Sequence, residues 1–122
     1  MAVFTDAQTD AINAQGGSVL VSAAAGSGKT TVLIERIIRM ITRRENPIDV
    51  DRLLIVTFTR AAASEMKERL AKAINSLLEN DPYNSLLLRQ RQLMYNTSIC
   101  TIDSFCGSVV REYFHILGVQ KD

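Results

Sequence analysis

The stretch AAAGSGKT at residues 23–30 decides the fold class of this sequence. Its small residues let the backbone turn tightly, so that consecutive N–H groups can point at one anion. The pattern is that of a phosphate-binding loop (P-loop), with Ala23 where the first glycine usually stands. Lys29 would meet the β- and γ-phosphates of a nucleotide, and the Thr30 hydroxyl would meet Mg²⁺. The expected nucleotide-binding residues of this stretch are Ala23, Ala24, Ala25, Gly26, Ser27, Gly28, Lys29, Thr30 and Thr31.

The segments on either side of the loop supply the context that its chemistry needs. Residues 18–22 (SVLVS) form a short apolar run that predicts a buried strand, and a helix is expected from Lys29 to about Arg44. A strand, a small-residue loop and a helix in this order favour a phosphate site at the helix N-terminus. A flexible loop before an ordinary helix is the alternative interpretation.

The rest of the chain alternates helices and strands. A short helix is expected from Thr5 to Asn13, with Thr5 and Gln8 spaced as in a capping box. Further strands are expected at residues 52–57 and 97–102, and further helices at 61–78, 85–95 and 104–117. This alternation predicts an α/β fold in which helices flank a parallel sheet.

Composition bounds the class of protein. The chain has 122 residues, which suits one domain, and its 47% hydrophobic and 22% charged residues are ordinary for a soluble protein. The net charge of +1 argues against a module that binds nucleic acid by bulk positive charge. No apolar run is long enough to span a membrane, and Cys100 and Cys106 fit no metal spacing. A cytoplasmic protein with free core thiols and no membrane partner is therefore expected.

Three further segments resemble the motifs of one helicase family. Residues 4–8 (FTDAQ) resemble the Q motif of UvrD/Rep-like superfamily 1 DNA helicases, residues 54–66 (LIVTFTRAAASEM) resemble motif Ia, and residues 98–106 (SICTIDSFC) resemble motif Ib. The segments are most similar to the AddA/RecB helicase–nuclease branch, and the resemblance runs from Phe4 to about Leu117. It implies that residues 1–122 are the N-terminal part of a RecA-like, ATP-binding motor lobe in a longer protein.

The resemblance also implies a function for single residues. The longer protein would use ATP and Mg²⁺ to move along DNA in recombinational double-strand break repair, would have nuclease activity, and would pair with a second helicase–nuclease subunit. Gln8 would hydrogen-bond adenine, and a purely structural role as capping partner of Thr5 is the alternative. The implied DNA contacts are Phe58, Thr59, Arg60, Ser104 and Phe105. A core position for Phe58 and a solvated charge at Arg60 are the alternatives there.

Asp103 ends the last expected strand, as the acid of a Walker B segment does. Ser104 follows it where a helicase Walker B has glutamate, so Asp103 is interpreted as the N-cap of the next helix. A Walker B Asp-Glu pair, an arginine finger and a nuclease cluster are not identified in the sequence. The 122 residues alone are therefore expected to bind nucleotide weakly and to hydrolyse it slowly or not at all.

Two other functions fit the P-loop alone. A small-molecule kinase would need an arginine-rich lid, and Arg36, Arg39 and Arg43 are instead interpreted as solvent-facing charge on one helix face. A stand-alone nucleotide-binding module would bind nucleotide with an affinity that does not respond to single-stranded DNA.

Overall fold

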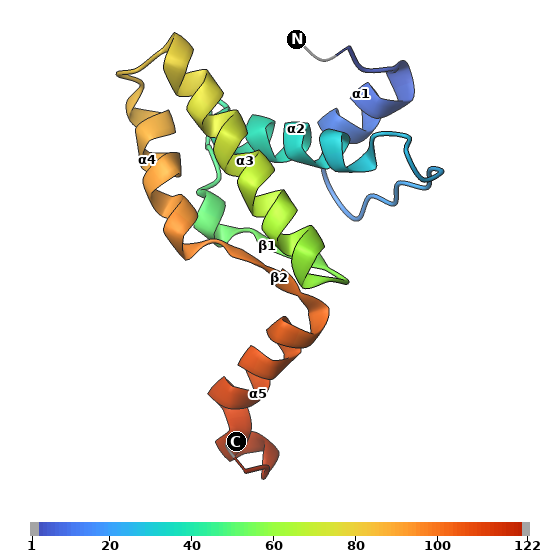
Figure 1. Ribbon diagram of the computed structural model, residues 1–122, viewed down its shortest axis with the longest axis vertical. Helices are drawn as coiled ribbons and strands as arrows, with labels where there is room; N and C mark the ends of the chain where they lie inside the picture. Colours follow the sequence, from blue (N-terminus) through green and yellow to red (C-terminus); the bar gives the residue numbers. More distant parts are fainter. Residues whose placement is uncertain (1–2, 121–122) are drawn as a thin grey trace.

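The computed structural model describes residues 3–120, which form five α-helices and a two-stranded parallel sheet. In chain order the elements are α1 (Asp6–Asn13), α2 (Lys29–Thr42), the helical turn η1 (Val50–Arg52), β1 (Leu54–Thr57), α3 (Arg60–Asn80), α4 (Ser85–Leu93), the helical turn η2 (Met94–Asn96), β2 (Ser98–Thr101) and α5 (Ile102–Leu117). Figure 1 shows α3 lying across the two strands, with α4 beside it and α5 extending away from the other helices.

The sheet confirms the parallel α/β prediction for two strands. β1 and β2 pair in parallel, with Leu54 opposite Ser98 and Thr57 opposite Thr101. Parallel neighbours need a long crossover, and α3 and α4 provide it here. Both strands therefore end at the same edge of the sheet, where α3 and α5 begin.

The hydrophobic core lies between α2, α3 and α4. Along α3 the buried side chains recur at almost every fourth residue, which places them on one face of the helix. Leu70 and Ile74 of α3 meet Ile41 of α2 there, and all three are fully buried. Each such side chain contributes roughly 1.5–3 kcal/mol through removal of apolar surface from water.

Gln90 of α4 is a polar residue at the centre of this core. Its side chain is fully buried, and all of its bonds go to backbone groups. Nε2 donates to the carbonyls of Ile41 at 3.1 Å and Ile48 at 3.2 Å, and Oε1 accepts from the Val50 N–H at 2.9 Å. The carboxamide thereby ties the end of α2 to η1, and no buried side-chain polar atom of residues 3–120 lacks a partner.

The strand predicted at residues 18–22 is wrong. The segment between α1 and α2 forms no strand, and Val19, Leu20 and Val21 are 45%, 93% and 47% exposed. A strand exists only when a neighbour pairs with its backbone N–H and C=O groups, and no described strand lies against this segment. Figure 1 shows it on the side of the molecule away from β1 and β2.

The predicted N-cap at Asp103 is also wrong. α5 begins at Ile102, and Thr101 caps it by accepting a hydrogen bond from the Ser104 N–H at 3.1 Å. Asp103 lies in the first turn of the helix, where its negative charge interacts favourably with the positive end of the helix dipole. None of the residues of α5 is buried, so Cys106 is an exposed thiol and the core position expected for it is wrong.

Candidate functional site

The P-loop joins the N-terminus of α2 through a left-handed glycine. Gly28 has φ 82° and ψ 22° and is the residue before the first turn of α2. This conformation suits a residue without a side chain. No side chain caps α2, and its first turn holds no acidic residue, unlike the first turns of α1 and α5. The first N–H groups of α2 and the positive helix end thus face the loop, which is the arrangement that binds phosphate.

Lys29 closes the loop by reaching back across it. Its Nζ donates to the Ala23 carbonyl at 2.6 Å, so the cation lies over the first residue of the P-loop. Ser27 adds two further bonds within the loop, because its N–H and its Oγ both donate to the Ala24 carbonyl, at 3.2 and 2.5 Å. The predicted loop residues are therefore brought together as one turn, with the Lys29 charge inside it.

Gln8 connects α1 to the P-loop. Its Oε1 accepts from the Thr5 N–H at 2.9 Å, its own N–H donates to Thr5 Oγ1 at 3.2 Å, and the capping box is confirmed. Its Nε2 also donates to the Ser27 carbonyl at 3.1 Å, 19 residues along the chain. One N–H and one lone pair of the carboxamide remain available, and these are the groups that pair with the edge of adenine.

The cavity at this junction is small. It has a volume of about 110 Å³, and Gln8, Ser27 and Lys29 line it together with Val32 at the base of α2. Pockets for whole small molecules hold roughly 300–1,000 Å³. This cavity alone is therefore too small for a whole nucleotide. Thr30 and Thr31 are exposed at the start of α2, and the Thr30 hydroxyl is free of bonds to described residues.

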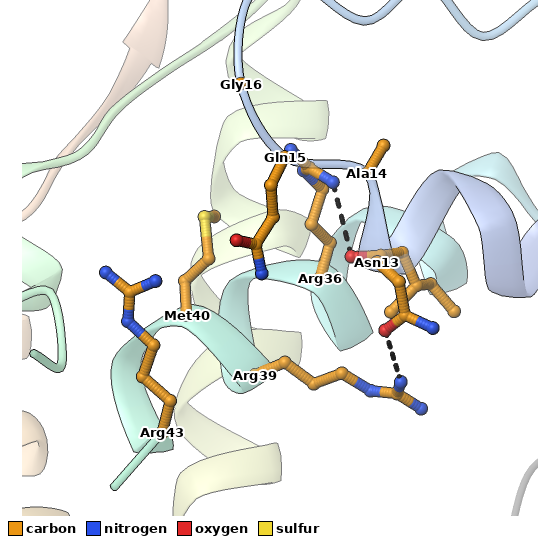
Figure 2. Close-up of a pocket in the computed structure, with 9 residues that line it drawn as sticks. Asn13, Ala14, Gln15, Gly16, Arg36, Arg39, Met40 and Arg43 are labelled. Carbon is orange, nitrogen blue, oxygen red and sulfur yellow. Dashed lines mark hydrogen bonds between the residues drawn. The ribbon is translucent and has the colours of Figure 1, made fainter. Parts of the chain in front are cut away.

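A larger cavity, of about 430 Å³, lies elsewhere, between the end of α1 and one face of α2 (Figure 2). Arg36 donates to the Ala11 and Ile12 carbonyls at 2.8 and 3.2 Å, and Arg39 donates to Asn13 Oδ1 at 2.8 Å. The interpretation as solvated charge is wrong for Arg36, which is partly buried and holds the last turn of α1, whereas Arg39 is exposed to solvent as expected. Arg43 is exposed and donates to the Asn46 carbonyl at 2.6 Å.

A second polar cavity lies where the two strands end. It measures about 300 Å³, and it contains Arg60 and Ser104, two of the residues implied as DNA contacts. Ser64 and Lys67, on the next turns of α3, line it as well. The sequence interpretation missed these two residues, although their spacing from Arg60 places all three on one helix face.

The other three implied DNA contacts do not line this cavity but are close in sequence to Arg60 and Ser104, which do. Phe58 is 90% exposed, so the alternative of a core position is wrong. Thr59 caps α3 by accepting from the Ala62 N–H at 3.1 Å, and Phe105 is partly exposed on α5. Ser104 Oγ accepts a bond from Thr101 Oγ1 at 2.8 Å, which fixes the position of its hydroxyl.

Residues 3–120 contain neither a clustered set of metal-ligating side chains nor a candidate membrane span. No group of three or more His, Cys, Asp or Glu side chains lies close enough together to hold a metal ion. None of the helices in that range has the length and apolar character of a membrane span.

The comparisons with known proteins identify the family. The model of the UvrD/REP helicase N-terminal domain matches residues 4–122, so the chain belongs to this helicase family. The P-loop, the Q-motif helix and the two strand ends described above all lie within the matched region.

Curated relatives narrow the resemblance to one kind of protein, a large ATP-dependent helicase/nuclease polypeptide. The chain is 53% identical over 117 residues to the one from Anoxybacillus flavithermus, with 96% of this chain and 10% of the relative covered. The relative from Clostridium perfringens is 54% identical over 117 residues (96% and 9% covered), and that from Thermoanaerobacter sp. is 54% identical over 119 residues (98% and 10%). The chain spans about a tenth of the length of these relatives.

Proposed function

We propose that this chain is the nucleotide-binding front part of a RecA-like motor lobe in a DNA helicase–nuclease. ATP hydrolysis by the whole protein drives movement along single-stranded DNA during recombinational double-strand break repair, in the cytoplasm and together with a second helicase–nuclease polypeptide. The proposal is supported by the family membership and by relatives whose names contain ATP-dependent helicase and nuclease.

The observation that carries the proposal is the P-loop as it enters α2. The left-handed Gly28, the uncapped first turn of α2 and the Lys29 ammonium group converge on the same turn of chain. The phosphates of ATP bind there, with Lys29 exchanging the Ala23 carbonyl for a phosphate oxygen. The exposed Thr30 hydroxyl would hold Mg²⁺, which would supply positive charge to offset that of the phosphates. Gln8 selects adenine with the donor and acceptor that its capping role leaves available.

The DNA contacts of the proposal lie where the two strands of the sheet end. Phe58 offers an exposed ring for base stacking, and Arg60 offers a charge to the backbone. Thr59, Ser104 and Phe105 add contacts around the same cavity. Ligands of open α/β sheets bind at the carboxyl ends of the strands, which is where these residues lie.

Binding of a fluorescent ATP analogue in the presence of Mg²⁺ tests the nucleotide site. Lys29→Ala removes a charged donor to phosphate and is expected to weaken binding about 10- to 100-fold. Lys72→Ala, which removes an exposed lysine on α3, is the charge-matched control and is expected to change nothing. Equal affinity for the Lys29→Ala variant and the unmodified chain would contradict the site.

A second measurement separates a motor lobe from a stand-alone module. Single-stranded DNA is expected to raise the nucleotide affinity of the chain, and the isolated 122 residues are expected to show little ATP turnover. A nucleotide affinity that is independent of DNA would favour the stand-alone module. Rapid turnover that Lys29→Ala abolishes would contradict the expected weakness of the isolated piece.

A further inference from the structure

Two neighbouring cavities lie along α3, and one residue lines both of them. The cavity at the strand ends (Arg60, Ser64, Lys67) and a second one of about 290 Å³ share Lys67 as a lining residue. The second cavity continues past Asn75 on α3 to Arg91 and Tyr95, at the junction of α4 and η2. We call the combined feature the α3 groove. Residues of α3 line it together with residues of α4, η2 and β2, and Figure 1 shows α3 next to α4 and β2.

The groove is basic although the chain is nearly neutral. The whole sequence has 14 Lys and Arg against 13 Asp and Glu. The residues lining the two cavities include Arg60, Lys67 and Arg91, and no acidic residue of the described chain is among them. Segregation of one sign of charge along a groove concentrates an anionic partner there.

The three cations of the groove are free for a ligand. Their side chains make no hydrogen bond or ion pair with residues 3–120. Two other arginines of the same helices are engaged: Arg69 of α3 pairs with Glu65, and Arg89 of α4 pairs with Asp49. Arg60, Lys67 and Arg91 are therefore unpaired, and all three are exposed.

Exposed aromatic rings stand at the two ends of the groove. Tyr95 is 87% exposed at its far end, and Phe58 is 90% exposed just before Arg60. The stretch of α3 from Arg60 to Asn75 spans about 22 Å at the rise of an α-helix. A row of cations between two exposed rings matches a single strand of nucleic acid, which offers phosphates and unstacked bases together.

We infer that the α3 groove guides single-stranded nucleic acid beyond the strand-end site, as far as Arg91 and Tyr95. Lys67 and Arg91 contact successive backbone phosphates, and Tyr95 stacks on a base at the far end. This inference rests on the proposed function, because it extends the strand bound at Phe58 and Arg60. It adds Lys67, Arg91 and Tyr95 to the interface and sets the direction in which the strand leaves it.

Fluorescence anisotropy with labelled thymidine oligonucleotides tests the inference on the 122-residue chain. An oligonucleotide of about twelve nucleotides reaches both ends of the groove, whereas one of about four reaches only part of it. The double variant Lys67→Ala/Arg91→Ala is expected to flatten the slope of log affinity against log salt by about 1.4 for the long strand, because it removes two phosphate contacts. Tyr95→Ala is expected to lower the affinity for the long oligonucleotide about fivefold or more.

Matched variants control for the general loss of a positive charge or of an aromatic ring, and a spectroscopic measurement controls for unfolding. Lys72→Ala removes a lysine of α3 that lies outside the groove, and Tyr83→Ala removes a 93% exposed tyrosine outside it, so both are expected to leave the affinity unchanged. Tyr95→Phe keeps the ring and is expected to retain the affinity. Far-UV circular dichroism checks that each variant keeps its helices.

The outcomes separate the groove from the function on which it rests. The inference is supported if Lys67→Ala/Arg91→Ala and Tyr95→Ala lower the affinity for the long oligonucleotide and leave the affinity for the short one unchanged. If these variants bind both oligonucleotides as tightly as the unmodified chain does, the inference about the groove is overturned. If Phe58→Ala and Arg60→Ala still weaken the binding of both oligonucleotides, the site at the strand ends is retained. Binding of neither strand by the unmodified chain overturns both the groove and the DNA part of the proposed function.

Discussion

The loop before α2 and the core around α3 contain apolar residues of the same kinds, but those of the loop are exposed and those of the core are buried. Leu20 is 93% exposed in the loop segment, whereas Leu70 is fully buried on α3. The difference lies in the neighbours, because α2 and α4 cover α3 while no described strand covers residues 18–22. Local apolar pattern therefore indicates what a segment can bury, and the rest of the fold decides whether it does.

The two regions also differ in what holds them together. The core depends on side-chain packing and on three hydrogen bonds of the buried Gln90 side chain. The P-loop depends on a few exposed bonds, chiefly those of Gln8 and Lys29. Substitutions in the core should therefore change the free energy of unfolding, and substitutions in the loop should change nucleotide binding.

The largest effect on unfolding is expected from Leu70→Ala. Removal of a fully buried leucine side chain leaves a cavity and should lower the free energy of unfolding by about 3–4 kcal/mol. Urea denaturation followed by circular dichroism measures the change. Leu20→Ala is the matched control and should cost less than about 0.5 kcal/mol. An equal decrease in the free energy of unfolding for the two variants would contradict the difference in burial between the two regions.

Gln90→Leu should have the next largest effect. Leucine fills a similar volume but leaves the Val50 N–H and the Ile41 and Ile48 carbonyls without their partner, which should cost about 2 kcal/mol. The same denaturation experiment measures it, with exposed Gln92→Leu as the control. A neutral result would show that backbone groups near η1 find other partners.

Gly28→Ala should affect the loop and spare the core. A residue with a side chain is strained by about 1–2 kcal/mol at φ 82°, and the new Cβ would lie 3.3 Å from Gln8 Nε2. Affinity for the fluorescent ATP analogue should therefore fall about tenfold. Gly107→Ala in helix α5, whose backbone is not left-handed, should leave the affinity unchanged. An unaltered affinity in the Gly28→Ala variant would mean that the turn tolerates a side chain.

The smallest effect is expected at the exposed Asp49–Arg89 pair. The hydrogen bond from Arg89 lowers the pKa of Asp49 below its ordinary 3.8, and Arg89 donates to both carboxylate oxygens, at 2.9 and 2.7 Å. A lowered folded-state pKa stabilises the fold above the unfolded value, and this contribution is lost as the pH falls through the folded value. Asp49→Asn should thus destabilise slightly at neutral pH and not at strongly acidic pH. A difference that persists in acid would contradict this.

Local signals predicted most of the helices. The capping box of Thr5 and Gln8 is an interaction within one turn, so the sequence contains all of its partners. β1 and β2 were also predicted within a few residues of their observed bounds. The start of α5 was misplaced because Thr101 and Asp103 are both good capping residues, and only the backbone selects Thr101.

Long-range partners were the part that sequence could not supply. Arg36 and Arg39 bind groups 24 to 26 residues away, two of them backbone carbonyls that any residue type would offer. The strand at residues 18–22 failed for the same reason, because pairing depends on another segment. The P-loop motif predicts a nucleotide site, but the cavity lined by Ser64 and Lys67 became visible only when α3 and β2 were seen side by side.

The carboxamide of Gln8 couples two parts of the molecule through a single torsion angle. Its oxygen and nitrogen belong to one rigid plane, so rotation about χ3 breaks the bond to Thr5 and the bond to Ser27 together. The start of α1 and the P-loop are therefore released or held as a unit. Amide hydrogen exchange at Thr5 would then report, from outside the loop, on events that occur at Ser27.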